Sequence, residues 1–178
     1  MDFSGGKIHP YKPGFTDPNA NILSLTTDFD GCRCKISNIE FSFEQTVYFA
    51  MIGDKIKSYG FLFEQTEIAD KSYVDLNYKH ENVHAISNIA LAAKIFPAVE
   101  MALKGKSSSQ ANSAACKDWA NSLASHYKDD FFYNQMLTAS NKWHSLVGYG
   151  SVRNSYSPEQ ETAYFLWFNS WLKSMAIP

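Results

Sequence analysis

Residues 80–84 read His80-Glu81-Asn82-Val83-His84, two histidines four positions apart with a glutamate after the first. On an α-helix, residues i and i+4 lie on the same face, so His80 and His84 can present two imidazoles to one metal ion. Glu81 lies about 100° around the helix axis from His80, within reach of a water polarised by that metal. This H-E-x-x-H pattern is typical of zinc hydrolases, and it predicts His80 and His84 as metal ligands and Glu81 as the general base.

These roles require a helix, and the residues that follow His80 favour one. Apolar residues recur on one helical stripe, and a proline is expected to end the helix: Val83, Ile86, Ala90, Ala93 and Pro97. The residues before His80 leave two alternatives. Alternation over 73–78 is a strand pattern, whereas Ser72 followed by Asp75 resembles a capping box that would start a helix at Tyr73. The metal site requires the helix, because a strand running straight into His80 leaves no helical turn before it.

The motif and the order of the elements resemble the zincin metallopeptidases, in which a sheet-bearing half leads into an H-E-x-x-H helix and a helical half follows. The resemblance implies that His80 and His84 bind Zn²⁺ and that Glu81 acts as base on the metal-bound water. It also implies a third protein ligand. The metzincin form is excluded, because Ser87 and Ala90 stand where it would have a glycine and a histidine.

The gluzincin form would take a glutamate from a later helix. Glu161 is the preferred candidate, because it shares one face of the predicted last helix with Phe165, Phe168 and Leu172 and would point inward. Glu100 is the second candidate, since Pro97 could turn the chain back. Stabilisation of the helix N-terminus is the ordinary role of a first-turn acid such as Glu161.

The remaining chain predicts an α+β fold, with a strand-rich N-terminal half (an antiparallel meander) followed by a helical C-terminal half. We expect a single domain over 1–178, with an irregular arm at 1–20, mainly strands at 21–79 and mainly helices at 80–178. A hairpin is predicted from Ile22 to Ile36 around Asp30-Gly31. Residues 39–43 and 60–66 are predicted strands, with a helix over 44–59 as the alternative.

The helical half is predicted as helices at 98–104, 112–127 and 130–146, with a linker at Ser107-Ser108-Ser109 and a loop at 148–157. The last helix has the best start signal, because Ser157, Pro158 and Gln160 combine an N-cap, a proline at the first position and a capping box. His126, His144 and Tyr149 are further candidates that could hold an oxyanion, although lone histidines beside aromatic residues more often serve the core or the surface.

Composition excludes several classes. The chain has 178 residues, 45% of them hydrophobic, and a net charge of −2, which favours a packed domain and offers no basic surface for nucleic acid. No stretch predicts a membrane span or a secretory signal, and three cysteines without a C-x-x-C pair favour a reduced, cytoplasmic setting.

Two functions follow. The first is a small zinc-dependent hydrolase that acts on a peptide or protein. The second is a non-catalytic binding or immunity-type protein, in which the aromatic residues of the C-terminal helix form a partner surface and the H-E-x-x-H is accidental.

Overall fold

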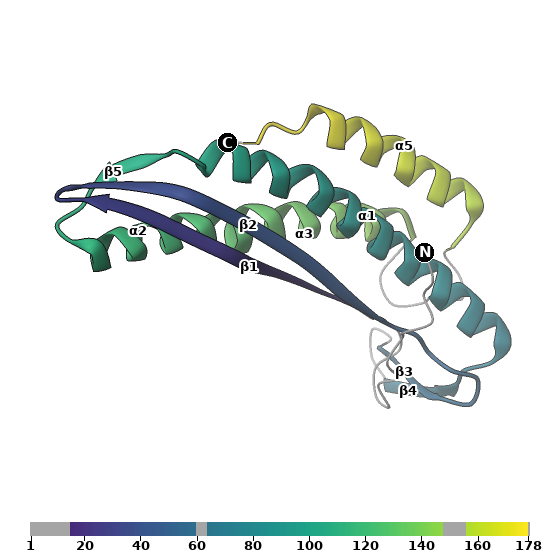
Figure 1. The fold of residues 1–178 in the computed structure, drawn as a ribbon. Helices are drawn as coiled ribbons and strands as arrows, with labels where there is room; N and C mark the ends of the chain where they lie inside the picture. Colours follow the sequence, from purple (N-terminus) through teal and green to yellow (C-terminus); the bar gives the residue numbers. More distant parts are fainter. Residues whose placement is uncertain (1–14, 60–63, 148–155, 178) are drawn as a thin grey trace. The chain divides into compact units, whose positions relative to one another are not determined.

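The computed structural model describes residues 15–59, 64–147 and 156–177. Its elements follow the chain in this order: β1 Phe15–Asp30, β2 Arg33–Tyr48, β3 Lys55–Tyr59, β4 Glu64–Ile68, α1 Lys71–Leu103, β5 Ser107–Ser109, α2 Ser113–Ser125, the π-helical η1 His126–Phe132, α3 Tyr133–Val147 and α5 Pro158–Ser174 (Figure 1). Strands precede most of the helices, so the predicted α+β class is confirmed.

β1 and β2 form the predicted hairpin around Asp30-Gly31 (Figure 1). Gly31 has a φ of 62°, a left-handed conformation that glycine adopts without steric cost, and the N–H of Cys32 donates to the carbonyl of Asp30 at 2.6 Å. The strands are longer than predicted. The irregular arm predicted for 1–20 is wrong for residues 15–20, which belong to β1, and residues 1–14 lie outside the described part.

The strands form two sheets, one with the order β1-β2-β5 and one that pairs β3 with β4. The linker predicted at Ser107-Ser108-Ser109 is wrong, because these residues form β5 and pair antiparallel with β2, with Lys35 opposite Ser107. A hydrogen bond from the Gly105 N–H to the carbonyl of Ile36 starts this pairing. The helix considered for 44–59 is also wrong, since its ends belong to β2 and β3. Of the strand predicted at 60–66, residues 64–66 lie in β4, and 60–63 lie outside the described part.

Residues 71–79 are helical, so the prediction of mainly strands up to residue 79 is wrong at its end. The Tyr73 N–H donates to the side chain of Asp70 at 2.8 Å, which caps the first turn of α1. Tyr73 and Asn77, four residues apart, are the buried positions of this segment, whereas Tyr78 of the alternating pattern is 42% exposed. Burial therefore follows the helical period and overrides the strand-like alternation.

Pro97 was expected to end the helix, but α1 continues to Leu103 and includes the separate helix predicted at 98–104. Pro97 itself lies on the exposed side. Ile95, Val99 and Leu103 are fully buried on the opposite side. Burial of three large side chains at about 1.5–3 kcal/mol each offsets the roughly 3 kcal/mol cost of an interior proline.

The predicted start of the last helix is confirmed. The Ser157 N–H donates to the side chain of Gln160 at 2.6 Å, and the Gln160 N–H donates to the Ser157 hydroxyl at 3.3 Å. This reciprocal capping box fixes the first turn of α5.

The described residues group into two compact units. The first unit takes the described parts of residues 1–18, 45–88 and 138–174, and the second takes those of 19–44, 89–137 and 175–178. The long elements β1, β2, α1 and α3 contribute residues to both units.

The core of the second unit packs aromatic rings of β2 against helices. Phe41 stacks on Phe96 with ring centroids 5.1 Å apart, and Phe43 meets Phe132 edge-on at 5.5 Å. Phe96 and Phe132 also contact each other at 4.7 Å, so α1 and η1 share this face of β2. The carboxylate of Glu100 accepts the N–H of Phe41 at 2.7 Å and ties α1 to the same strand.

The core of the first unit joins α1, α3 and α5. Trp143 of α3 is fully buried and lies edge-on to Tyr164 of α5 at 5.3 Å. Tyr164 stacks on Phe168 and shares a 2.8 Å hydrogen bond with the hydroxyl of Ser87 on α1. The three helices are therefore held by one buried aromatic cluster with a polar contact at its centre.

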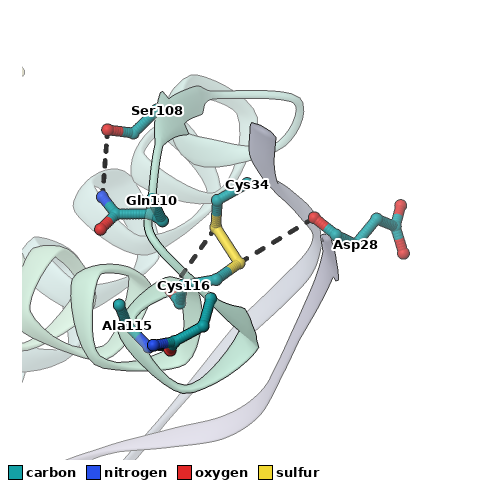
Figure 2. The surroundings of a disulfide bond; sticks show 7 residues. Asp28, Cys34, Ser108, Gln110, Ala115 and Cys116 are labelled. Carbon is teal, nitrogen blue, oxygen red and sulfur yellow. Dashed lines mark hydrogen bonds between the residues drawn. A yellow bond between two sulfur atoms is a disulfide. The ribbon is translucent and has the colours of Figure 1, made fainter. Parts of the chain in front are cut away.

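A disulfide joins Cys34 of β2 to Cys116 of α2, with both residues fully buried (Figure 2). The Cys116 sulfur lies 3.9 Å from the backbone carbonyl of Asp28, so the bond sits where β1, β2 and α2 meet. Cys32 is free and exposed. Disulfides persist in oxidising compartments, so this bond argues against the reduced setting predicted from the cysteine count, and the cytoplasmic location stays a prediction.

α1 is also long and apolar enough to cross a membrane by length and composition alone. Of its most apolar 18-residue window, 44% is buried within the protein. Core helices of soluble proteins pass the same test, so this feature is weak support for a membrane span.

We expect the disulfide to stabilise the second unit strongly, because it closes a loop with a sequence separation of 82 residues. Replacing both Cys34 and Cys116 with serine should lower the free energy of unfolding by about 4 kcal/mol, from the chain entropy restored to the unfolded state. Urea unfolding with and without reductant measures this difference. Cys32→Ser is the matched control and should leave the free energy unchanged; an equal loss in that variant would contradict the assignment of the bond.

Candidate metal centre

Three histidine side chains converge in the first unit. His80 and His84 lie on α1, and His144 lies on α3. The Nε2 atom of His84 is 3.3 Å from that of His80 and 3.2 Å from that of His144. One nitrogen from each ring falls within a 4.8 Å group, so the cluster could hold a metal ion.

The spacing of the nitrogens matches a metal site. Zinc–nitrogen bonds of about 2.0–2.1 Å in a tetrahedron place neighbouring ligand atoms about 3.3 Å apart. The two closest nitrogen pairs have this separation. Three imidazole ligands would leave one position of a four-coordinate metal open to water or substrate, as in catalytic zinc sites.

Burial favours the uncharged form of the rings, which is the form that binds metals. Desolvation, together with the charge of His144, lowers the pKa of His80 from 6.5 to about 4. Desolvation, followed by the neighbouring rings, lowers the pKa of His84 from 6.5 to about 3. The pKa of His144 is also lowered by burial. All three imidazoles are therefore uncharged near pH 7 and can each offer a nitrogen lone pair to a metal ion.

One hydrogen bond must change when a metal binds. The Trp143 indole N–H donates to Nδ1 of His80 at 3.2 Å. A neutral ring that accepts at Nδ1 carries its proton on Nε2, the atom that faces His84. A metal at Nε2 would move that proton to Nδ1, and Trp143 would then have to release the ring. The positions of the ring nitrogens and the neutral state of the rings thus fit a metal ion, whereas the hydrogen bond from Trp143 to His80 opposes metal binding.

Glu81 lies on α1 directly after His80 and is 5% exposed. The hydroxyl of Thr16 on β1 donates to its Oε2 atom at 3.1 Å. Burial raises the pKa of Glu81 from 4.5 to about 7, and the Thr16 hydrogen bond partly opposes the rise. A carboxylate with a pKa near neutrality can take up a proton and release it again at physiological pH.

The two glutamates predicted as third ligand have other partners. Glu161, the preferred candidate, accepts a hydrogen bond from the phenol of Tyr156, and the metal group found among the described residues contains His144 in its place. The same contact with Glu161 and burial raise the pKa of Tyr156 above its usual range. Glu100, the second candidate, accepts the N–H of Phe41 in the second unit.

His144 was considered from the sequence only as an oxyanion group, so its place beside His84 was missed. The spacing of 60 residues belongs to no local motif, and only the packing of α3 on α1 brings the rings together. The available signal was one of residue type, since the chain has five histidines and imidazole is a preferred zinc ligand. Of the other candidates, His126 pairs with Asp130 at 2.8 Å, and Tyr149 lies outside the described residues.

His144→Ala should abolish stoichiometric metal binding, because two imidazoles from one helix leave half of a tetrahedron unfilled. Glu161→Gln is the matched control and should keep one metal per chain, since Tyr156 occupies that side chain. Metal analysis after zinc loading and dialysis measures both variants. The opposite result, with metal lost only in the glutamine variant, would restore Glu161 as the ligand.

The metal-free protein should become less stable on acidification. Between pH 6.5 and 4.5 the unfolded chain protonates His80 and His84 whereas the folded chain does not, so both groups favour unfolding as the pH falls. Glu81 acts in the opposite direction, because its raised pKa makes the folded chain bind a proton first. The two terms of His80 and His84, less that of Glu81, give a net loss of roughly 1.4 kcal/mol per pH unit, and His144, whose pKa is also lowered, adds to this loss.

Urea unfolding at several pH values, in the presence of a chelator, measures this slope. His84→Leu removes one of the two histidine terms and should flatten it. A wild-type stability that rises from pH 6.5 to 4.5 would contradict burial of neutral rings.

No family model matches the chain, and neither a curated protein nor a solved structure matches it. The function is therefore inferred from the histidine cluster and Glu81 themselves.

Proposed function

We propose that the protein is a zinc-dependent hydrolase that cleaves peptide bonds, with His80, His84 and His144 as metal ligands and Glu81 as general base. The observation that carries the proposal is the convergence of three Nε2 atoms from α1 and α3, with two separations of 3.2 and 3.3 Å, while α1 also carries a buried carboxylate. The condition set by the sequence is met, because α1 starts at Lys71, about two and a half turns before His80.

The donor set supports zinc over harder cations. Three neutral imidazoles suit zinc and the neighbouring transition metals, whereas magnesium and calcium prefer oxygen ligands. Among described residues, no carboxylate belongs to the three-residue group. A metal held there would lower the pKa of a bound water and polarise a carbonyl.

The residues of the chain supply the proton transfer. Glu81 would take the proton from the attacking water and return it to the leaving amine. Its burial keeps bulk water away from the carboxylate and strengthens the local electrostatics. The peptide substrate itself is supported only by the H-E-x-x-H pattern and its resemblance to zincins.

The alternative function as a binding protein depends on the aromatic residues of α5. Tyr164 and Phe168 are buried in the core. The rings of Trp167 and Trp171 stack with their centroids 5.1 Å apart, and Leu166 is 70% exposed. Trp167 and Trp171 are partly exposed and stay available to a partner, but the histidine cluster has no role in such a surface. The hydrolase is therefore the better supported proposal.

Glu81→Gln should keep the metal and lose activity by a factor of about 10² to 10⁴, because an amide cannot accept the proton. Release of dye from fluorescein-labelled casein by the zinc-loaded protein measures the rate, and metal analysis confirms the loading. Glu159→Gln, at an exposed position of α5, is the control and should match the wild type. Full activity in the Glu81 variant, or none in the zinc-loaded wild type, would refute the proposed reaction.

A further inference from the structure

Thr16 and Glu81 are 65 residues apart in sequence but share two contacts. The Thr16 hydroxyl donates to the Oε2 atom of Glu81 at 3.1 Å, and its oxygen lies 3.4 Å from the backbone carbonyl of the same residue. Thr16, near the start of β1, therefore holds the side chain of Glu81 on α1.

The contact has a geometric consequence for the carboxylate. Glu81 is 5% exposed, so water cannot freely satisfy it, and Thr16 is its one hydrogen-bond donor found among the described residues. A donor on Oε2 fixes the rotation of the carboxyl plane and leaves Oε1 as the oxygen available to a reacting proton. Without the hydroxyl, the carboxyl plane could rotate and exchange its two oxygens.

We propose that Thr16 is a positioning residue, which orients the Glu81 carboxylate so that one defined oxygen receives the proton in the hydrolytic step. The inference rests on the proposed function, since it assigns a use to the orientation of the base. It adds a requirement that the H-E-x-x-H motif does not contain: Thr16, at the start of β1, must orient the glutamate of the motif.

Thr16→Val tests the proposal, because valine keeps the shape of threonine and removes the donor. The turnover number on fluorescein-labelled casein should fall roughly 10- to 100-fold, the range of a hydrogen bond to a charged group, while KM stays within about twofold. Thr16→Ser retains the hydroxyl and should recover most of the rate. Thr26→Val, on the exposed part of β1, is the matched control and should match the wild type.

A second measurement needs no turnover. Acetohydroxamate chelates zinc through two oxygens and gives its proton to a neighbouring base, so its affinity for the zinc-loaded protein reports the orientation of Glu81. Thr16→Val should bind this probe about tenfold or more weakly, and Thr16→Ser should bind it like the wild type. The zinc content and thermal midpoint of each variant show that it is folded, and Thr16→Ala replaces the valine variant if that one does not fold.

The outcomes separate the two proposals. If Glu81→Gln is inactive but Thr16→Val keeps the wild-type turnover and acetohydroxamate affinity, Thr16 has no positioning role and the hydrolase stands. If casein is not cleaved, the hydrolase fails and the role of Thr16 in the hydrolytic step fails with it, whereas acetohydroxamate binding still shows whether Thr16 orients the Glu81 carboxylate. A loss that serine does not recover assigns Thr16 to packing and overturns the proposal, and failure to bind zinc overturns both.

Discussion

The hydrogen bond between Asp70 and the N–H of Tyr73 caps the start of α1, and the position of the two histidines of the candidate metal centre depends on that start. A helix that began at His80 would leave the first imidazole in a frayed turn with unpaired backbone groups. Because the cap lies at Asp70, the two histidines occupy the regular interior of a 33-residue helix. In a regular helix, residues four positions apart have a fixed separation, so the rings of His80 and His84 lie next to each other.

In the first unit, α1 buries four polar residues at positions where apolar side chains are more usual. Asn77, Glu81, Ser87 and Asn88 are all buried on α1, and three of them have described partners: the Ala50 N–H, the Thr16 hydroxyl and the Tyr164 phenol. Each such group costs free energy unless it is paired. A buried carboxylate and two partly buried imidazoles one turn apart are more typical of a functional site than of a helix that serves packing alone.

The sequence was informative where a signal is local. The hairpin at Gly31 and the capping box at Ser157 were predicted because a few adjacent residues determine the conformation. His80 and His84 were predicted to share one face of a helix for the same reason. The approach of the third histidine was not predicted, because it depends on the packing of α3 on α1, two segments that no spacing rule connects. β5 was missed likewise, since three serines form a strand only when β2 offers a free edge.

The disulfide imposes an order on biosynthesis. Cys34 leaves the ribosome well before Cys116, and until then its thiol has the exposed thiol of Cys32 two residues away. Either cysteine could form a bond to Cys116 once an oxidant is present, and exchange between the two bonds then needs no further oxidant. Pairing with Cys34 buries both sulfurs between the hairpin and α2, whereas a bond to Cys32 would pull the exposed turn toward the helix. The folded sheet thus selects the correct partner, and chains oxidised before β2 has docked are the ones at risk of misfolding.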